Sequence, residues 1–374
     1  MLRMRDRDYR DQLVDGRRGR ASLRCAQVPQ GGRRLPQNAG MRAARLTVAG
    51  SDPRFELHEL ADPTPGAGEV VVELVTAALN RRDWWLWKAA STPVPVTLGS
   101  DGAGRVALVG DGVRDISPGD AVVINPALGW GDDEGSGAAT FDILGSPTEG
   151  TFAQRVVVPA INVHAKPAAL SWEQAAAFPL AGLTAWRAVV TCARAAPGRR
   201  VLITGGGSGV STFCVQIAHA LGAEVWVTSG DDAKIARCIE LGALGGFRYD
   251  DPEWPGQVLA ATGGAGVHAV VDSFGGEGWA KALDALARGG VLVNYGDTGG
   301  DEATIPVAGI YWQWRSLVGT TMGSPSEFRA LCDHVATAAW RPAIDSVHPL
   351  EDISAAANRL TAPSRFGKVV VRIA

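Results

Sequence analysis

The sequence is poor in residues that hold metals or cross-link a chain. Its 374 residues include five cysteines and six histidines, with no Cys-x-x-Cys pair and no histidine at metal-ligand spacing. This argues against a disulfide framework and a structural zinc site, and favours free thiols in a reducing compartment. No apolar run approaches the ~20 residues of a membrane-spanning helix. We therefore expect a cytoplasmic protein with no membrane partner.

Lysine and glutamate are absent from the first 40 residues, which contain ten arginines and four aspartates. The whole chain has 36 basic and 39 acidic residues, which leaves 26 basic and 35 acidic residues for 41–374. An acidic body argues against nucleic acid as a partner.

Residues 1–40 also lack the apolar stretch of a secretory signal, and few apolar anchors accompany their arginines, prolines and glycines. Such a composition cannot bury enough surface to offset chain entropy. We predict a disordered arginine-rich N-terminal extension, or a start assigned too early with Met41 as the native beginning. N-terminal sequencing of the native protein distinguishes the two.

The remaining chain changes its pattern near residue 163. Short β-branched runs between Gly/Pro turns predict a β-rich domain over 41–162. Over 163–320 strand and helix patterns alternate, which predicts an α/β fold with a doubly wound parallel sheet. Residues 321–374 end in a strand at Lys368–Arg372, and we expect them to return to the first domain.

The most informative motif is a glycine-rich loop. The apolar strand Arg200–Thr204 runs into Gly205 and Gly207, Val210 occupies the third glycine position, and a helix pattern follows over Ser211–Leu221. Such a loop lets backbone N–H groups approach a diphosphate, whose charge the helix N-terminus favours. The spacing predicts a dinucleotide site.

The next strand indicates which dinucleotide binds. It ends at Ser229, where NAD enzymes usually carry an acid, and Lys234 and Arg237 follow. At ~4 Å and an effective dielectric near 20, a cation and a phosphate charge attract by about 4 kcal/mol before desolvation. This favours NADPH, although Asp231 and Asp232 would oppose it if they turned inward. We interpret these two as N-cap and first-turn residues of the next helix.

Further short motifs follow one another along the chain. They are Gly66-x-Gly68-Glu69-Val70, Leu98-Gly99-Ser100-Asp101-Gly102-Ala103-Gly104, Pro118-Gly119-Asp120, Gly150-Thr151-Phe152-Ala153, Leu180-Ala181-Gly182-Leu183-Thr184-Ala185-Trp186, Gly289-Gly290 and Phe366-Gly367-Lys368-Val369-Val370. With them, residues 41–374 resemble the medium-chain dehydrogenase/reductase superfamily, nearest its zinc-independent quinone oxidoreductase-like and zinc-type alcohol dehydrogenase-like branch. The resemblance implies a GroES-like catalytic domain split around a Rossmann domain.

This resemblance also implies roles for single residues. Thr184 would lie near the nicotinamide ribose, and Ser229, Lys234 and Tyr249 would surround the adenosine 2′-phosphate. The predicted cofactor contacts are Thr184, Gly205, Gly207, Ser208, Gly209, Val210, Ser229, Lys234, Tyr249 and Gly296.

Zinc-binding members use cysteine, histidine and a second cysteine or acid. The matching positions here hold Asn80, Ser100 and Leu180, and the lobe at 129–145 has none of the four structural cysteines of those relatives. Amide, hydroxyl and alkyl groups do not replace thiolate or imidazole on zinc. We predict NADP(H) as cofactor and no zinc.

Without a metal, another group must stabilise charge on the substrate oxygen. The candidates are Asn80, Arg81 and Arg82, although an arginine could instead hold the diphosphate or form a structural ion pair. Asp83 is expected to orient an arginine. The predicted substrate pocket is a flat apolar wall of Trp84, Trp85, Trp87, Trp130 and Trp312, with core packing as the alternative for each.

Together these features predict an NADPH-dependent reductase of quinones, enones or other activated C=C or C=O compounds. The alternatives are a zinc-free alcohol dehydrogenase of a biosynthetic pathway and a non-catalytic NADPH-binding protein. The family resemblance adds the expectation of a homodimer.

Overall fold

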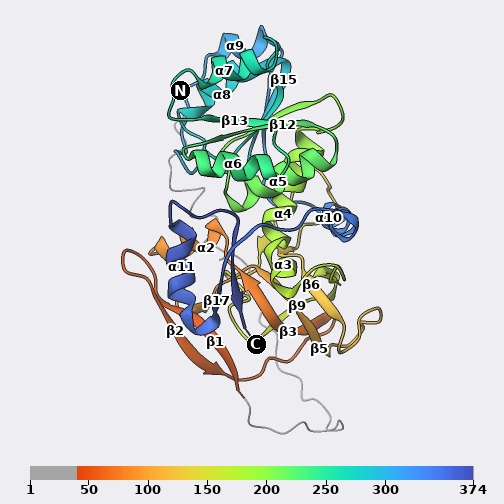
Figure 1. The fold of residues 1–374 in the computed structure, drawn as a ribbon. Coiled ribbons are helices and arrows are strands. Elements are labelled where there is room, and N and C mark those ends of the chain that lie inside the picture. Colours follow the sequence, from red (N-terminus) through yellow and green to blue (C-terminus); the bar gives the residue numbers. More distant parts are fainter. Residues whose placement is uncertain (1–39, 374) are drawn as a thin grey trace.

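The computed structural model describes residues 40–373, which form a β-rich body and an α/β body joined through a set of helices (Figure 1). The predicted N-terminal extension lies outside the described residues. Within the described part of the chain, no helix is both long enough and apolar enough to cross a membrane.

The β-rich body is built on a large, mainly antiparallel sheet with strand order β10-β6-β5-β3-β18-β17 and with β9 beside β3. A smaller sheet has the order β2-β1-β4, and β7 pairs with β8. The strands are β1 (Met41–Val48), β2 (Arg54–Leu60), β3 (Glu69–Ala78), β4 (Val96–Thr97), β5 (Asp101–Val109), β6 (Ala121–Ile124), β7 (Ala127–Leu128), β8 (Asp142–Ile143), β9 (Arg155–Pro159), β10 (Val163–Ala165), β17 (Ile344–Pro349) and β18 (Lys368–Arg372).

The α/β body contains a parallel sheet with the order β13-β12-β11-β14-β15-β16. Its elements are β11 (Arg200–Ile203), α5 (Gly209–Ala220), β12 (Glu224–Ser229), α6 (Asp232–Glu240), β13 (Gly245–Arg248), α7 (Trp254–Ala261), β14 (Val267–Asp272), α8 (Gly278–Ala285), β15 (Leu286–Asn294), α9 (Val307–Tyr311) and β16 (Ser316–Gly319). The central strands are apolar and buried, as expected for a parallel sheet covered on both faces. The predicted doubly wound sheet is confirmed.

The two bodies meet through helices and through the C-terminal strand. The remaining elements are α2 (Arg81–Lys88), η1 (Ala160–Asn162), α3 (Trp172–Ala177), α4 (Pro179–Trp186), the π-helical turn η2 (Arg187–Cys192), α10 (Pro325–Thr337), η3 (Leu350–Asp352) and α11 (Ile353–Thr361). Of these, α4 contacts both β5 in the β-rich body and α5 in the α/β body. Strand β18 pairs antiparallel with β3, so the end of the chain lies in the β-rich body. Because residues 363–368 reach this strand past the glycine loop, the C-terminal segment belongs to the cleft between the bodies.

Two element boundaries differ from the sequence prediction. Helix α5 begins at Gly209 and not at Ser211, because the Ser208 hydroxyl accepts a hydrogen bond from the Ser211 amide and caps the helix. The residue pattern over Thr151–Val158 is typical of a strand, but β9 begins only at Arg155, because the amides of residues 151 and 152 bond to the loop at 98–99 instead. Both differences come from tertiary or capping contacts that apolar periodicity does not report.

Candidate functional site

The glycine-rich loop has the conformation that a dinucleotide cradle requires. Gly205 and Gly207 have φ values of 66° and 96°, a region that other residues rarely adopt. A Cβ atom on Gly207 would come within 2.9 Å of Lys234 Cδ and 3.0 Å of the Phe366 ring. The loop is therefore tightly enclosed by α6 and the C-terminal segment, and only glycine fits at this point.

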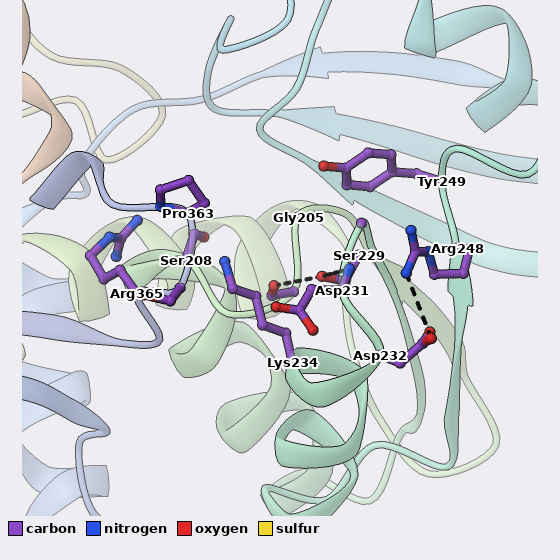
Figure 2. A pocket seen from close by; sticks show the side chains of 13 residues that line it. Gly205, Ser208, Ser229, Asp231, Asp232, Lys234, Arg248, Tyr249, Pro363 and Arg365 are labelled. Atoms are coloured by element: carbon purple, nitrogen blue, oxygen red, sulfur yellow. Dashed lines mark hydrogen bonds and ion pairs between the residues drawn. The ribbon is translucent and has the colours of Figure 1, made fainter.

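A pocket of about 670 Å³ opens beside this loop. It is lined by Gly205, Gly206, Ser208, Ser229, Gly230, Asp231, Asp232, Lys234, Arg248, Tyr249, Pro363, Ser364 and Arg365. Figure 2 shows Lys234 and Arg365 on one side of the pocket and Tyr249 with Arg248 on the other. The structure thus brings together five predicted cofactor residues: Gly205 and Ser208 from the glycine loop, Ser229 from the end of β12, Lys234 from α6 and Tyr249 from the turn after β13.

Sequence reasoning missed two cations of this pocket, Arg248 and Arg365. Arg248 ends β13 and forms a 2.6 Å ion pair with Asp250. Arg365 lies some 160 positions after the glycine loop, and its Nη1 donates to the Gly367 carbonyl at 2.6 Å. The only signal for Arg365 was its place next to the Phe366-Gly367-Lys368 motif, which does not reveal that this segment covers the glycine loop.

The cations of the cleft repel one another. Burial first, and then the neighbouring Arg365, lower the pKa of Lys234. Burial also lowers the pKa of Arg365, and Arg81 and Arg359 lower it further. Asp231 raises the pKa of Lys234 and Asp345 raises the pKa of both residues, but burial and the neighbouring cations together keep both pKa values lowered. An anionic ligand between these cations would relieve the repulsion, because opposite charges favour each other's charged forms.

The two aspartates after β12 have the roles predicted from the sequence. The Asp231 side chain caps α6 by accepting from the Ala233 amide at 2.8 Å. Asp232 lies in the first turn of the helix and is 3.6 Å from Arg248. Both carboxylates line the pocket, but each is engaged with a partial or full positive charge.

Tyr249 lines the same pocket, and the exposed ring of Phe274 lies next to it. Tyr249 and Phe274 have ring centroids 6.2 Å apart and an interplanar angle of 32°. They remain 47% and 43% exposed, although large apolar rings are usually covered. Such a pair offers a surface on which a planar base can stack.

The other predicted cofactor residues lie around the carboxyl ends of the strands. Thr184 is buried, and its hydroxyl donates to the Leu180 carbonyl at 3.0 Å. Gly296 follows β15, and its carbonyl accepts from Asn294 Nδ2 at 2.7 Å. Gly209 and Val210 form the first turn of α5.

The segment with the predicted catalytic residues begins helix α2. Asn80 is its N-cap; its Nδ2 donates to Asp101 Oδ2 at 2.8 Å, and its Oδ1 accepts from Lys368 Nζ at 2.5 Å. Arg82 is enclosed, and its Nη2 donates to the carbonyls of Ile143 and Ser146. The side chains of Asn80 and Arg82 are therefore held by protein partners.

Arg81 differs from these two residues. Its guanidinium carbon lies 4.2 Å from the centre of the Trp84 ring, and its buried Nε has no hydrogen-bond partner in the described part of the chain. Burial lowers the pKa of Arg81, and Asp297 partly offsets this. Of the predicted donors, Arg81 is the one whose charge acts on Arg365, a residue of the pocket beside the glycine loop.

Asp83 has a different partner from the one expected. Its Oδ2 accepts from the Asn80 amide at 2.7 Å and closes a capping box, while its buried Oδ1 has no hydrogen-bond partner among residues 40–373. The carboxylate thus holds the backbone at the start of α2 and forms no hydrogen bond to an arginine. Burial is the largest effect on Asp83 and raises its pKa from 3.8 to about 6.

This buried carboxyl predicts a pH dependence of stability. Because the pKa is higher in the folded chain, the contribution of Asp83 to the free energy of unfolding is complete below about pH 4 and is lost as pH rises through about 6. The expected loss is about 3 kcal/mol, from ~1.36 kcal/mol per pKa unit. Denaturant titrations at pH 4–7 should show this slope in the wild type and not in Asp83→Asn. Asp52→Asn, at a site that is 84% exposed, should keep it.

The positions aligned with zinc ligands hold no metal-binding set. Asn80 is engaged as described, the Ser100 hydroxyl donates to the Leu144 carbonyl at 2.6 Å, and Leu180 has only its amide directed at Asp101. Among residues 40–373, no three His, Cys, Asp or Glu side chains gather as a metal site. The donors present do not fit zinc.

Three of the predicted pocket tryptophans, Trp84, Trp85 and Trp87, lie on α2, whereas Trp130 and Trp312 lie in other parts of the chain. Trp87 is buried in the β-rich core, where it meets Phe55 edge-on, and Trp130 is buried in the core that includes the glycine-loop strand and helix. Trp84 lies under Arg81, and Trp85 is 40% exposed. Trp312 is 64% exposed near the edge strand β16.

Comparison with known proteins agrees with this arrangement. Residues 66–168 match the alcohol dehydrogenase GroES-like domain family, and residues 209–337 match the zinc-binding dehydrogenase family. The chain belongs to the medium-chain dehydrogenase/reductase superfamily. The predicted family and the GroES-like plus Rossmann fold are thereby confirmed.

Three relatives illustrate the range of this superfamily. A zinc-type alcohol dehydrogenase-like protein of Schizosaccharomyces pombe is 33% identical over 316 residues, 82% of this chain and 91% of its own length. The quinone oxidoreductase 1 of Escherichia coli is 30% identical over 245 residues, 65% of this chain and 68% of its own. The solved structure of an NAD-dependent alcohol dehydrogenase has a TM-score of 0.84 at 38% identity and covers 89% of this chain and 100% of its own. The chain is thus an NAD(P)-dependent oxidoreductase of this superfamily.

Proposed function

We propose that this protein is an NADPH-dependent reductase of quinones, enones or other activated C=C or C=O compounds, and that it works without zinc. The observation that carries the cofactor assignment is the pocket beside the glycine loop, where Lys234, Arg365 and Arg248 surround Ser229. No acid occupies the Ser229 position, and the nearby aspartates are engaged with the α6 N-terminus and Arg248. This charge arrangement suits an adenosine 2′-phosphate.

The residues of the chain supply binding and orientation. NADPH would bring the hydride, and the first turn of α5 and the loop at Gly205 would hold its diphosphate. Tyr249 and Phe274 offer a stacking surface for the adenine. Arg81 contributes positive charge in the cleft, toward the diphosphate or the substrate oxygen. Catalysis is then mainly positioning of substrate against cofactor.

The direct test combines calorimetry and turnover. We expect NADPH to bind at least about ten-fold more tightly than NADH, and NADPH oxidation with some members of a panel of quinones, enones and aldehydes. Tighter binding of NADH would contradict the NADPH assignment. Tight NADPH binding without turnover of any panel member would favour the non-catalytic alternative. Oxidation of alcohols with NADP⁺, without reduction of any panel member, would favour the zinc-free alcohol dehydrogenase.

Zinc independence is tested separately. We expect substoichiometric zinc by elemental analysis and unchanged turnover after dialysis against a strong chelator. The supporting observation is the donor set of Asn80, Ser100 and Leu180, whose polar atoms already have protein partners. One zinc ion per chain would contradict this part of the proposal. The described cysteines are all free thiols, which supports the proposed cytoplasmic location.

We also propose that the protein is a homodimer that pairs through β16. This strand is the edge of the parallel sheet, and nearby Val307, Tyr311, Trp312 and Trp314 are 59–72% exposed. Exposed aromatic residues beside a free strand edge are typical of interaction surfaces.

The dimer predicts a clear effect of one charge at this surface. Trp312→Glu should halve the mass measured by size-exclusion chromatography with light scattering, because a carboxylate would be desolvated in the interface. Ile161→Glu, at an equally exposed apolar site in the β-rich body, should leave the mass unchanged. A monomeric wild type would refute the dimer.

A further inference from the structure

A buried lysine lies where four elements meet beneath the cleft. Lys368 is the first residue of β18, and its side chain is 2% exposed. Its Nζ donates to Asp101 Oδ2 at 2.8 Å and to Asn80 Oδ1 at 2.5 Å. Because Asn80 Nδ2 also donates to Asp101 Oδ2, the ammonium, amide and carboxylate form a closed triangle. Burying a charged pair this completely is costly, and here the surrounding hydrogen bonds offset it.

On one side the triangle controls the start of α2. Asn80 is the N-cap of this helix, and the next residue is Arg81, whose charge acts on Arg365 in the pocket beside the glycine loop. With both polar atoms of its side chain bound, Asn80 cannot rotate, so the first turn of α2 is fixed relative to β5 and β18. The position of Arg81 therefore depends on Lys368.

On the other side the triangle controls the start of α4. The second carboxylate oxygen of Asp101, Oδ1, accepts from the Leu180 amide at 2.7 Å, in the first turn of that helix. Thr184, the expected neighbour of the nicotinamide ribose, follows one turn later on α4. The negative charge of Asp101 is favoured at this helix N-terminus, and Lys368 balances it.

The lysine also touches the cofactor cradle itself. A Cβ atom on Gly209, the first residue of α5, would come 3.1 Å from Lys368 Cδ. The aliphatic stem thus lies against the helix turn that would receive the diphosphate, while the ammonium reaches into the β-rich body. A single side chain links the dinucleotide-binding turn to both walls of the cleft.

We propose that Lys368 is a positioning residue for hydride transfer, whose ammonium fixes the first turns of α2 and α4 relative to the glycine loop. This inference rests on the proposed reductase function. The lysine itself contacts neither hydride nor substrate; it sets the distance between the cofactor and the groups opposite it. A misplacement near 1 Å is enough to slow such a reaction by about 100-fold.

The test compares the single variant Lys368→Met with the double variant Lys368→Met/Asp101→Asn, called the neutral pair. The neutral pair leaves no unpaired buried charge, so it keeps the test usable if the single variant fails to fold. For the folded variants we expect kcat to fall at least about 10-fold, while the Kd for NADPH from fluorescence titration stays within about three-fold. Arg372→Met, which breaks the Glu173 ion pair on the same strand, should leave both values unchanged. If the neutral pair has a kcat within about three-fold of wild type, Lys368 serves only to balance the buried charge of Asp101. This result would overturn the proposal.

A second measurement does not depend on turnover. Hydrogen exchange by mass spectrometry should be faster in peptides covering residues 80–88 and 179–186 of the Lys368 variants, and unchanged there in Arg372→Met. Unchanged exchange in the Lys368 variants would overturn the proposal even if the wild type reduces no substrate. A wild type without turnover, combined with faster exchange in these variants, would refute the proposed function and leave the link between the helices intact.

Discussion

Replacing Arg187 with methionine is expected to lower the free energy of unfolding by about 3–5 kcal/mol, the usual cost of leaving one member of a buried ion pair uncompensated. Arg187 Nη1 is 2.7 Å from Glu327 Oε2, and the two side chains are only 8% and 10% exposed. The same guanidinium donates to the Glu134 and Gly135 carbonyls and lies 5.3 Å from the Trp130 ring. Its loss leaves the buried Glu327 carboxylate without its cation, with hydrogen bonds from the Ser324 amide and the Thr191 hydroxyl remaining, and denaturant titration should detect the change.

The structure supplies matched controls for this prediction. Arg372→Met breaks a pair whose arginine is 58% exposed, and it should cost no more than about 1 kcal/mol. Adding Glu327→Leu to Arg187→Met should recover part of the stability, because no unpaired charge remains. An Arg187→Met protein as stable as Arg372→Met would show that the pair contributes little.

The same substitution should loosen the lobe at 129–145. Arg187 lies at the start of η2 and reaches this lobe through the carbonyls of residues 134 and 135 and through the Trp130 ring. We expect limited proteolysis to cut the lobe faster in Arg187→Met than in the wild type. In this chain a buried arginine holds a segment that carries cysteines in zinc-binding relatives.

Lys234→Ala is expected to weaken NADPH binding by about 10- to 100-fold, which is about 1.4–2.8 kcal/mol, with a change below about three-fold for NADH. The reason is the charge of the 2′-phosphate, which only NADPH carries and which Lys234 and Arg365 would share. Calorimetric titration of both coenzymes gives the ratio directly.

The control is Lys281→Ala, which removes an exposed lysine from α8 of the same body. It should leave both affinities unchanged apart from a small general effect of net charge. An equal loss of NADPH and NADH affinity in Lys234→Ala would place the lysine near the diphosphate or the loop itself. In that case the 2′-phosphate assignment would be wrong.

The sequence predicts the part of the site around the glycine loop, but not the part that the C-terminal segment contributes. The glycine loop, Ser229 and Lys234 lie within 30 residues of one another, and local rules for strand, turn and helix place them correctly. Asp231 follows the same logic, since its capping role depends only on the helix it precedes. Contacts between Arg365 and the loop, or between Lys368 and Asn80, join positions 160 to 288 residues apart. No local pattern reports them.

Burial accounts for the remaining differences between expectation and structure. The sequence does not show that Asp83 is enclosed and that Trp87 and Trp130 pack in two different cores. Likewise, it does not show that Arg82 donates to backbone carbonyls while Arg81 lies over the Trp84 ring. Each outcome depends on which neighbours the folded chain brings within a few ångströms.

By itself, the sequence determined the superfamily, the doubly wound sheet and the dinucleotide loop, because apolar periodicity and glycine positions act over short stretches of chain. Only the tertiary structure decided which charges share the cofactor pocket and which candidate residues are already engaged. The physical reason is that electrostatic and hydrogen-bond energies depend on the distance between groups and on their burial. For residues 363–368 these distances are fixed only when β18 pairs with β3 in the folded chain.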